Sequence, residues 1–298
     1  MRVGVTVPLG YGDLEDGRAP TFAQTFDFSQ RAERAGLDSI WVYDHLLFRF
    51  TGEPDEGLNE GWTTLSALAP VVPRVELGAL VMCSSFRNAG LMAKMAQTLD
   101  DLSGGRLVLG LGCGWHEPEY TAFGYPFDHL VGRFAEDLEV VRRLLDGKMV
   151  DFEGRWSRYA GARLLPPPGR RPPILVAAKG ARMLRLTAEH ADAWNTAWYG
   201  GLDALARQRL EELDEACDAV GRPRHEIRRT IGIRLHEPGQ AAGDPRGTDA
   251  DGPGLADILD ELDDAGFDDA IIWSLAKSHA AIERIGEARE LHVSRDRD

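Results

Sequence analysis

The stretch AGLMAKMAQTLDDLSGGRLVLGLGCG, residues 89–114, decides the fold class. Its first half repeats apolar residues three and four positions apart, which is the spacing of one buried helix face. Gly104 and Gly105 follow as a helix cap. The next segment, 106–112, is almost continuously apolar, as in a strand covered on both sides of a parallel sheet. A glycine-capped helix that leads directly into such a strand is the repeating unit of an α/β protein.

The same alternation continues in both directions from this stretch. It gives eight predicted strands, each followed by a helical pattern, in 298 residues. Eight such units fit a closed (β/α)₈ TIM barrel better than an open sheet, and we expect one domain over residues 1–298. The predicted strands cover 3–7, 39–43, 76–82, 106–112, 174–178, 192–195, 227–233 and 268–273. The clearest helical patterns cover 21–36, 62–72, 89–105 and 127–145, with a final helix from about His279.

Two segments interrupt the alternation. Residues 147–173 are rich in glycine and proline and are predicted as an irregular excursion before the fifth strand. Residues 238–253 are rich in Gly, Pro, Asp and Ala and are predicted as a mobile loop after the seventh strand. A loop at that end of a barrel strand lies on the active-site side. A lid over the site and an insertion without a role both fit it.

Composition excludes several classes of function. The net charge of −14 argues against nucleic-acid binding, which needs a basic face. The three cysteines (Cys83, Cys113 and Cys217) are far apart, which argues against a disulfide framework or a zinc site. We expect a cytoplasmic protein, because the sequence shows neither a signal-peptide core nor an apolar run of about 18 residues.

In a TIM barrel, functional side chains follow the carboxyl ends of the strands. Asp44 and His45 follow the second predicted strand. A histidine there suits proton transfer near neutral pH, and Asp44 would contact a cofactor or orient the imidazole. The alternative is that Asp44 caps a turn and His45 packs in the wall.

Two further strand ends carry distinctive patterns. GLGCG, 110–114, fails the test of a dinucleotide fingerprint, which needs a third glycine that opens a helix in the first βα unit and an acidic residue after the next strand. We expect its glycines instead to let backbone approach a flat ring. His116, Glu117 and Glu119 do not form an HExxH metal motif. AAKGAR, 177–182, lies where a strand meets a helix, which suits a phosphate.

Several ordered blocks resemble the bacterial-luciferase-like flavin and deazaflavin oxidoreductases, especially the branch that uses coenzyme F420. They are AERAGLDSIWVYDH (32–45), LGALVMCSSFRN (77–88), LMAKMAQTLDDLSGGRLVLGLGCGWHEPEY (91–120) and PPILVAAKGARMLRLTAEHADAWN (172–195). AFGYPF with Arg133 and the C-terminal AGFDDAIIW also fit.

The resemblance implies a flavin-like ring across the carboxyl ends of the strands. It implies a non-prolyl cis peptide at Leu80-Val81, His45 as the proton-handling group, and a phosphate on the backbone of 177–180. The predicted catalytic residues are His45, Asp44 and Glu119, of which His45 and Asp44 match family positions. The implied cofactor contacts are Asp44, Leu80, Val81, Met82, Gly112, Trp115, His116, Ala177, Ala178, Lys179 and Gly180.

One position departs from the resemblance. The sugar-phosphate dehydrogenase branch has a glutamate where this chain has Trp115, which argues against a sugar-phosphate substrate; Glu117 or Glu119 would have to replace that acid. Trp115, Trp194, Trp198, Phe86 and Phe48 suggest an aromatic-lined pocket, although core packing explains lone aromatics equally well.

The resemblance leaves three functions open. The first is hydride transfer between F420 and a small organic substrate. The second is an FMN-dependent monooxygenase that uses O₂ and flavin from a partner reductase. The third is a barrel that binds flavin without turnover. The resemblance also implies a homodimer, whereas the spacing of His116, Glu117 and Glu119 argues against a metal site.

Overall fold

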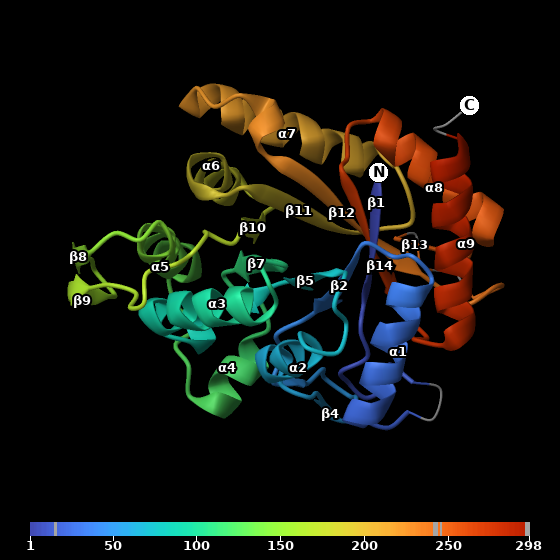
Figure 1. Ribbon diagram of the computed structural model, residues 1–298, viewed down its shortest axis with the longest axis horizontal. Helices are drawn as coiled ribbons and strands as arrows, with labels where there is room; N and C mark the ends of the chain where they lie inside the picture. The colour runs from blue at the N-terminus through green and yellow to red at the C-terminus, as the bar shows by residue number, and fades with distance from the viewer. Residues whose placement is uncertain (15–16, 241–243, 245, 296–298) are drawn as a thin grey trace.

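The computed structural model describes residues 1–14, 17–240, 244 and 246–295. Eight parallel strands form a closed barrel in the order β10-β11-β12-β14-β1-β2-β5-β7, and pairing between β7 and β10 completes the circle (Figure 1). All eight predicted strands are confirmed. They are β1 (Arg2–Thr6), β2 (Ser39–Val42), β5 (Glu76–Ala79), β7 (Leu107–Gly112), β10 (Ile174–Ala177), β11 (Ala193–Tyr199), β12 (Arg228–Leu235) and β14 (Asp269–Ser274).

Helices surround the barrel (Figure 1). Side-chain caps fix several of their starts, as where Thr21 and Gln24 form a capping box on α1 and Asn88 caps α3. The helices are α1 (Phe22–Arg34), α2 (Gly61–Leu68), α3 (Ala89–Leu102), α4 (Glu117–Phe123), α5 (Leu130–Leu145), α6 (Ala181–His190), α7 (Ala204–Val220), α8 (Gly252–Asp264) and α9 (His279–Arg295).

The barrel interior is packed. Trp41, Val108, Leu175, Ala193 and Ile271 form a buried cluster, and the partly buried Leu80 and Val81 pack against it. Trp41 needs a glycine beside it, because a Cβ at Gly78 would lie 2.1 Å from the indole. The barrel is therefore closed below its carboxyl end, here called the mouth, and a ligand must bind above Leu80 and Val81.

The excursion between α5 and β10 is more regular than predicted. It contains an antiparallel hairpin of β8 (Val150–Glu153) and β9 (Arg158–Ala162), and Figure 1 shows this hairpin projecting beyond α5. The Glu136 carboxylate accepts hydrogen bonds from the backbone N–H groups of the turn 155–157. A contact from a neighbouring helix thus orders a hairpin whose own residues, rich in glycine, gave no strand pattern.

The segment 238–253, predicted as a mobile loop without periodicity, contains regular structure in part. Gly247–Thr248 forms the short strand β13 beside β12, and α8 begins at Gly252 behind its cap Asp251. The Asp244 carboxylate accepts from Arg234 at 2.8 Å and from the Arg246 N–H at 3.0 Å. Residues 241–243 and 245, which the same prediction covers, lie outside the described residues.

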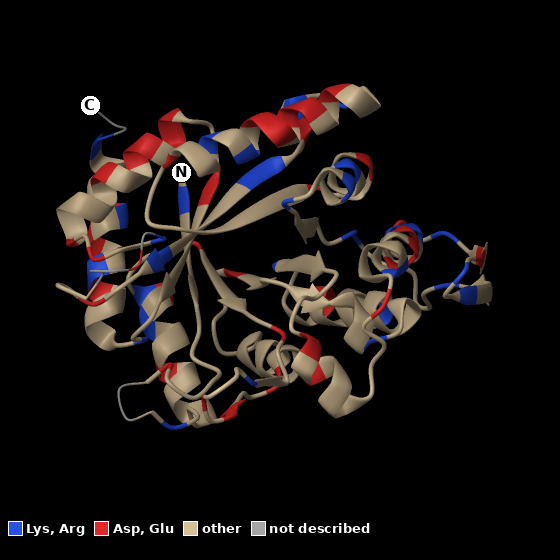
Figure 2. Cartoon of the chain, turned by 180° about the vertical axis from the view of Figure 1, so that it is seen from behind, with Lys and Arg blue, Asp and Glu red and all other residues tan. Residues whose placement is uncertain are grey.

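The remaining short elements lie in the loops. They are β3 (Leu47–Phe48), β4 (Glu56–Gly57), β6 (Met82–Cys83), η1 (Ser84–Phe86) and η2 (Arg224–Glu226). No helix in the described ranges is long and apolar enough to cross a membrane. Figure 2 shows acidic and basic positions interspersed over the outer helices.

Candidate active site at the mouth of the barrel

The floor of the mouth is the segment that joins β5 to β6. The Leu80-Val81 peptide is cis, as predicted, and a second non-prolyl cis bond joins Ala197 and Trp198. Val81 lies so close to β7 that a Cβ at Gly112 would meet its Cγ2 at 2.6 Å. A Cβ at Gly110 would lie 1.7 Å from the Ala79 carbonyl oxygen. These two glycines therefore make room for the neighbouring chain segment, and the expectation that they admit a flat ring is not needed to explain them.

A histidine and a glutamate form a hydrogen-bonded pair at the mouth. Nδ1 of His45, which follows β2, donates to Oε1 of Glu119 on α4 at 2.9 Å. Oε2 of Glu119 accepts from the Leu46 N–H at 2.8 Å, and the glutamate is almost completely buried. The imidazole is therefore fixed in orientation through Nδ1, and Nε2 has no hydrogen-bond partner among the described residues.

Asp44 does not orient this imidazole. Its carboxylate accepts from the Cys83 N–H at 2.9 Å and from both terminal nitrogens of Arg87, at 2.5 and 2.9 Å. Arg87 is also paired with Glu60. The Asp44 side chain is completely buried, and its hydrogen bond to Cys83 connects the end of β2 to β6. The sequence suggested that Asp44 contacts a cofactor or orients the His45 imidazole. The second role belongs to Glu119.

Aromatic rings surround His45 on one side. The Phe48 ring centre lies 4.4 Å from that of His45, and the Trp115 ring centre lies 5.5 Å away, edge on. Nε2 of the buried His116 accepts from the Arg49 N–H at 3.0 Å, and burial lowers the pKa of this imidazole. A neutral His116 thus holds the loop that carries Phe48, while Trp115 is 60% exposed. We call Phe48, Phe50 and Trp115 the aromatic wall.

The junction of β10 and α6 gathers positive charge. Gly180, directly before α6, has no side chain to cap the helix, which leaves helix N–H groups available for an anion. Partial burial, together with Arg209 and Arg246, lowers the pKa of Lys179. Lys179 has no acidic partner in the part of the chain that the structure describes. The Ala178 N–H is occupied by the Asn195 carbonyl at 3.2 Å, so the available groups begin at Lys179.

A third cluster at the mouth escaped the sequence analysis. Nζ of Lys277, after β14, lies 2.5 Å from Oδ1 of Asp13, after β1, and the Lys277 side chain is completely buried. Oδ2 of Asp13 accepts from Tyr43 and from the Leu9 and Gly10 N–H groups. Burial alone would raise the pKa of the Asp13 carboxyl. The charge of Lys277 and the hydrogen bonds outweigh this effect, so the pKa of Asp13 is lowered. Asp13 and Lys277 are separated by 264 positions, and no local pattern signals such a pair.

The predicted site residues occupy three kinds of position. His45, Glu119, Trp115 and His116 meet at the mouth, with Leu80 and Val81 below them. Ala177, Ala178, Lys179 and Gly180 lie at the β10–α6 junction, while Asp44, Met82 and Gly112 are buried. Two aromatic residues suggested for the pocket belong to packing instead: Trp194 is stacked on Phe267, and Phe86 lies in a cluster with Tyr120.

The chain is similar to known proteins in sequence and in fold. A family model described as luciferase-like monooxygenase matches residues 1–237. An F420-dependent glucose-6-phosphate dehydrogenase of Kineococcus radiotolerans is 32% identical over 250 residues, which cover 82% of this chain and 73% of that protein. Pyrimidine monooxygenase RutA of Methylorubrum extorquens is 31% identical over 237 residues, which cover 74% of this chain and 63% of that protein.

The fold is shared with solved structures of much lower sequence identity. An F420-dependent secondary alcohol dehydrogenase, solved with an F420-acetone adduct, superposes with a TM-score of 0.79. The match covers 98% of each chain at 16% identity, and it shows the same closed α/β barrel.

Proposed function

The chain belongs to the luciferase-like monooxygenase family and is an oxidoreductase, and from this premise we propose that it transfers a hydride between coenzyme F420 and a small organic substrate. The observation that carries the proposal is the position of the His45–Glu119 pair. It lies above the Leu80-Val81 floor at the same end of the barrel as the uncapped start of α6. A proton-handling group, a floor for a ring and an anion site therefore face one mouth.

The described residues fit a deazaflavin cofactor. Leu80 and Val81 offer an apolar surface for the ring, and Lys179, Arg246 and the start of α6 offer charge and N–H groups for a phosphate. When bound, the deazaflavin supplies the hydride chemistry. Reduced deazaflavin reacts poorly with oxygen, so the activity is that of a dehydrogenase or reductase.

His45 supplies the accompanying proton transfer. Glu119 holds Nδ1, so Nε2 is the atom that accepts a proton from a substrate undergoing oxidation, or returns one to a substrate undergoing reduction. The Glu119 carboxylate stabilises the positive charge that His45 carries while it holds the proton. Glu119 is thus a positioning residue, and the aromatic wall beside His45 limits the access of water.

The mouth favours an uncharged or apolar substrate over a sugar phosphate. Trp115 and Phe48 place aromatic surface beside His45. The cations at the ends of β12 and β14 are occupied, because Arg234 is paired with Asp244 and Lys277 with Asp13. A phosphate on the substrate would find no unpaired cation on that side of the described mouth.

An FMN-dependent monooxygenase is the second candidate. The 31% identity with pyrimidine monooxygenase RutA favours it specifically, and it would use the same floor and the same anion site. It would require O₂ and reduced flavin from a partner reductase. A barrel that binds flavin without turnover is the third, and it gives the ordered His45–Glu119 pair no purpose.

Titration of the purified protein with F420 and with FMN, followed by tryptophan fluorescence, tests the proposal. Trp115 is 60% exposed at the mouth, so its emission should change when a ring binds beside it. Trp115→Phe is the control that assigns the signal. Tight FMN binding without any response to F420 would reject F420 as the cofactor.

A further inference from the structure

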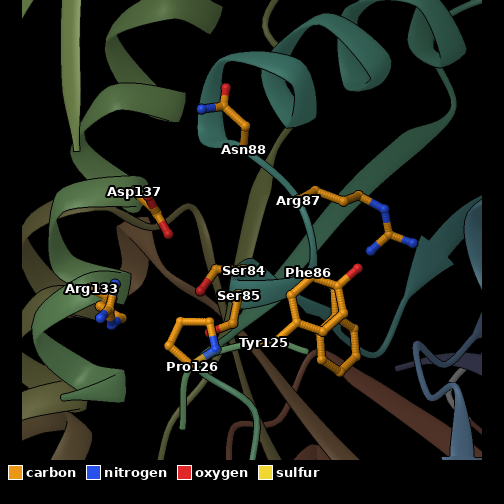
Figure 3. A pocket seen from close by; sticks show the side chains of 9 residues that line it. All are labelled: Ser84, Ser85, Phe86, Arg87, Asn88, Tyr125, Pro126, Arg133 and Asp137. Carbon is orange, nitrogen blue, oxygen red and sulfur yellow. The ribbon is translucent and has the colours of Figure 1, made fainter. Parts of the chain in front are cut away.

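A cavity lies where η1, after β6, leads into α3. It has a volume of about 240 Å³ and opens between η1, the start of α3 and α5 (Figure 3). None of the residues placed at the floor, the anion site or the His45–Glu119 pair lines it. Its lining consists of Ser84, Ser85, Phe86, Arg87, Asn88, Tyr125, Pro126, Arg133 and Asp137.

Two serine hydroxyls in this lining have no hydrogen-bond partner in the part of the chain that the structure describes. The buried Oγ atom of Ser84, a residue only 7% exposed, makes no hydrogen bond within the described residues. The Ser85 Oγ makes none that meets normal geometry there either, although the Tyr120 hydroxyl lies beside it. A buried polar group without a partner is destabilising unless a ligand or water satisfies it. Figure 3 shows Asp137 reaching from α5 towards Ser84, with Pro126 and Arg133 beside the same space.

The charged groups around Asp137 are already paired, whereas Asp137 is not. Arg133 on the same helix binds Asp128, and Arg87 points away from Asp137 to bind Asp44. Asp137 forms no hydrogen bond or ion pair within the described residues. Burial, with the nearby Glu136, raises the pKa of the Asp137 carboxyl to about 7, and Arg133 acts in the opposite direction.

The other groups near the cavity do not favour an anion. Asn88 Oδ1 accepts from the Gly90 and Leu91 N–H groups, so the start of α3 is already capped. Glu136 is held by the hairpin turn, and Tyr159 on β9 is the remaining titratable group that faces Asp137. The cavity thus offers one carboxylate and two hydroxyls, which suit a ligand with positively charged hydrogen-bond donors.

We propose that this cavity is a second ligand site, and that it takes a small molecule bearing an ammonium group, held by the Asp137 carboxylate and the Ser84 and Ser85 hydroxyls. The volume admits a compound of several heavy atoms. Behind it lies a void of about 10 Å³ that touches Ser84, Arg87 and Asp137, too small for more than one water. A ligand would therefore lie in the outer cavity, in reach of the arginine that holds Asp44.

Three two-carbon probes of matched size test the ligand class: ethanolamine as the cation, ethylene glycol as its neutral analogue and glycolate as the anion. Ligand-observed NMR titration of the full chain without cofactor gives each affinity. Ethanolamine should bind at least tenfold more tightly than ethylene glycol. Its affinity should rise between pH 6 and pH 8, because Asp137 ionises over this range.

Asp137→Asn isolates the carboxylate. It should weaken ethanolamine binding at least tenfold and remove the dependence on pH, whereas Asp101→Asn, at an exposed position on α3 outside the cavity, should leave both unchanged. Ser84→Ala should weaken binding several-fold, and it keeps the test available if Asp137→Asn does not fold. Equal affinities for the three probes, preference for glycolate, or wild-type binding by Asp137→Asn would each overturn the proposal.

Discussion

At the scale of single residues, the carboxylate that orients His45 lies 74 positions away in the chain. His45 could be predicted because it directly follows a strand, where a TIM barrel places its functional groups. Glu119 was one of two glutamates that fitted the same loop. Only the fold shows that it turns inward to Nδ1 of His45, and that Asp44 is instead held by Arg87.

Glu119→Gln tests the positioning role. The amide keeps the shape but removes the charge that stabilises protonated His45, so we expect kcat to fall by about 10- to 100-fold. The pH profile of kcat should also shift to lower pH, because the protonated imidazole is less stable without the carboxylate. A purely structural role of Glu119 would leave the profile where it is, and a shift to higher pH would contradict the proposed role.

His45→Ala removes the proton-handling group itself. It should lower kcat by roughly 10²- to 10⁴-fold while the affinity for F420, measured by fluorescence, stays within a few-fold of wild type. Unchanged turnover in His45→Ala would exclude the proposed catalytic role of His45.

At the scale of elements, the β12–α8 loop reaches the start of α6. The loop was predicted as mobile because its composition carries no periodicity, and the sequence could not show that β13 and Asp244 hold Arg246 near Lys179. The hairpin β8–β9 was missed for the same reason, since the groups that order its turn come from α5.

Arg246→Ala tests the contribution of this loop to cofactor binding. Loss of one cation at the anion site should weaken F420 binding by about 3- to 10-fold and reduce its dependence on salt. Arg163→Ala, which removes an exposed arginine on the hairpin side, is the matched control. Equal affinities for both variants would remove Arg246 from the site.

The Asp137 carboxyl on α5 also makes stability depend on pH. In the unfolded chain the carboxyl has its usual pKa of 3.8, whereas in the folded chain its pKa is raised to about 7. As pH rises, the unfolded chain therefore loses this proton at a lower pH than the folded chain does. Asp137 consequently lowers the free energy of unfolding increasingly between pH 4 and pH 7. Asp137→Asn should raise the melting temperature at pH 8 by a few degrees and leave it nearly unchanged at pH 4. An equal shift at both pH values would contradict the raised pKa.

At the scale of the whole molecule, the Asp13–Lys277 pair joins the first and last barrel strands at the mouth. β1 and β14 pair in register from Arg2 and Asp269, and Lys277 crosses the same seam above them. The alternation of helices and strands was enough to predict the barrel, because each unit carries its own pattern. The pair that ties the two ends of the sheet has no such signal, since it exists only once the barrel closes.

A double-mutant cycle measures this tie. Lys277→Met should lower the free energy of unfolding by about 3–5 kcal/mol, because it leaves the Asp13 carboxylate buried without its cation. Adding Asp13→Asn should recover part of that loss, since both charges are then gone. Denaturant unfolding of the four proteins gives the coupling, and strictly additive losses would show that the pair does not act as a unit.

The close approach of Val81 to Gly112 also limits how this sequence can diverge. Any side chain at position 112 would collide with the branched side chain at 81, so the two positions are not free to drift separately. Among descendants of a common ancestor, a change from glycine at 112 should appear only in lineages where position 81 has already become smaller. The order of substitutions along a family tree would thus record a contact at the floor of the barrel.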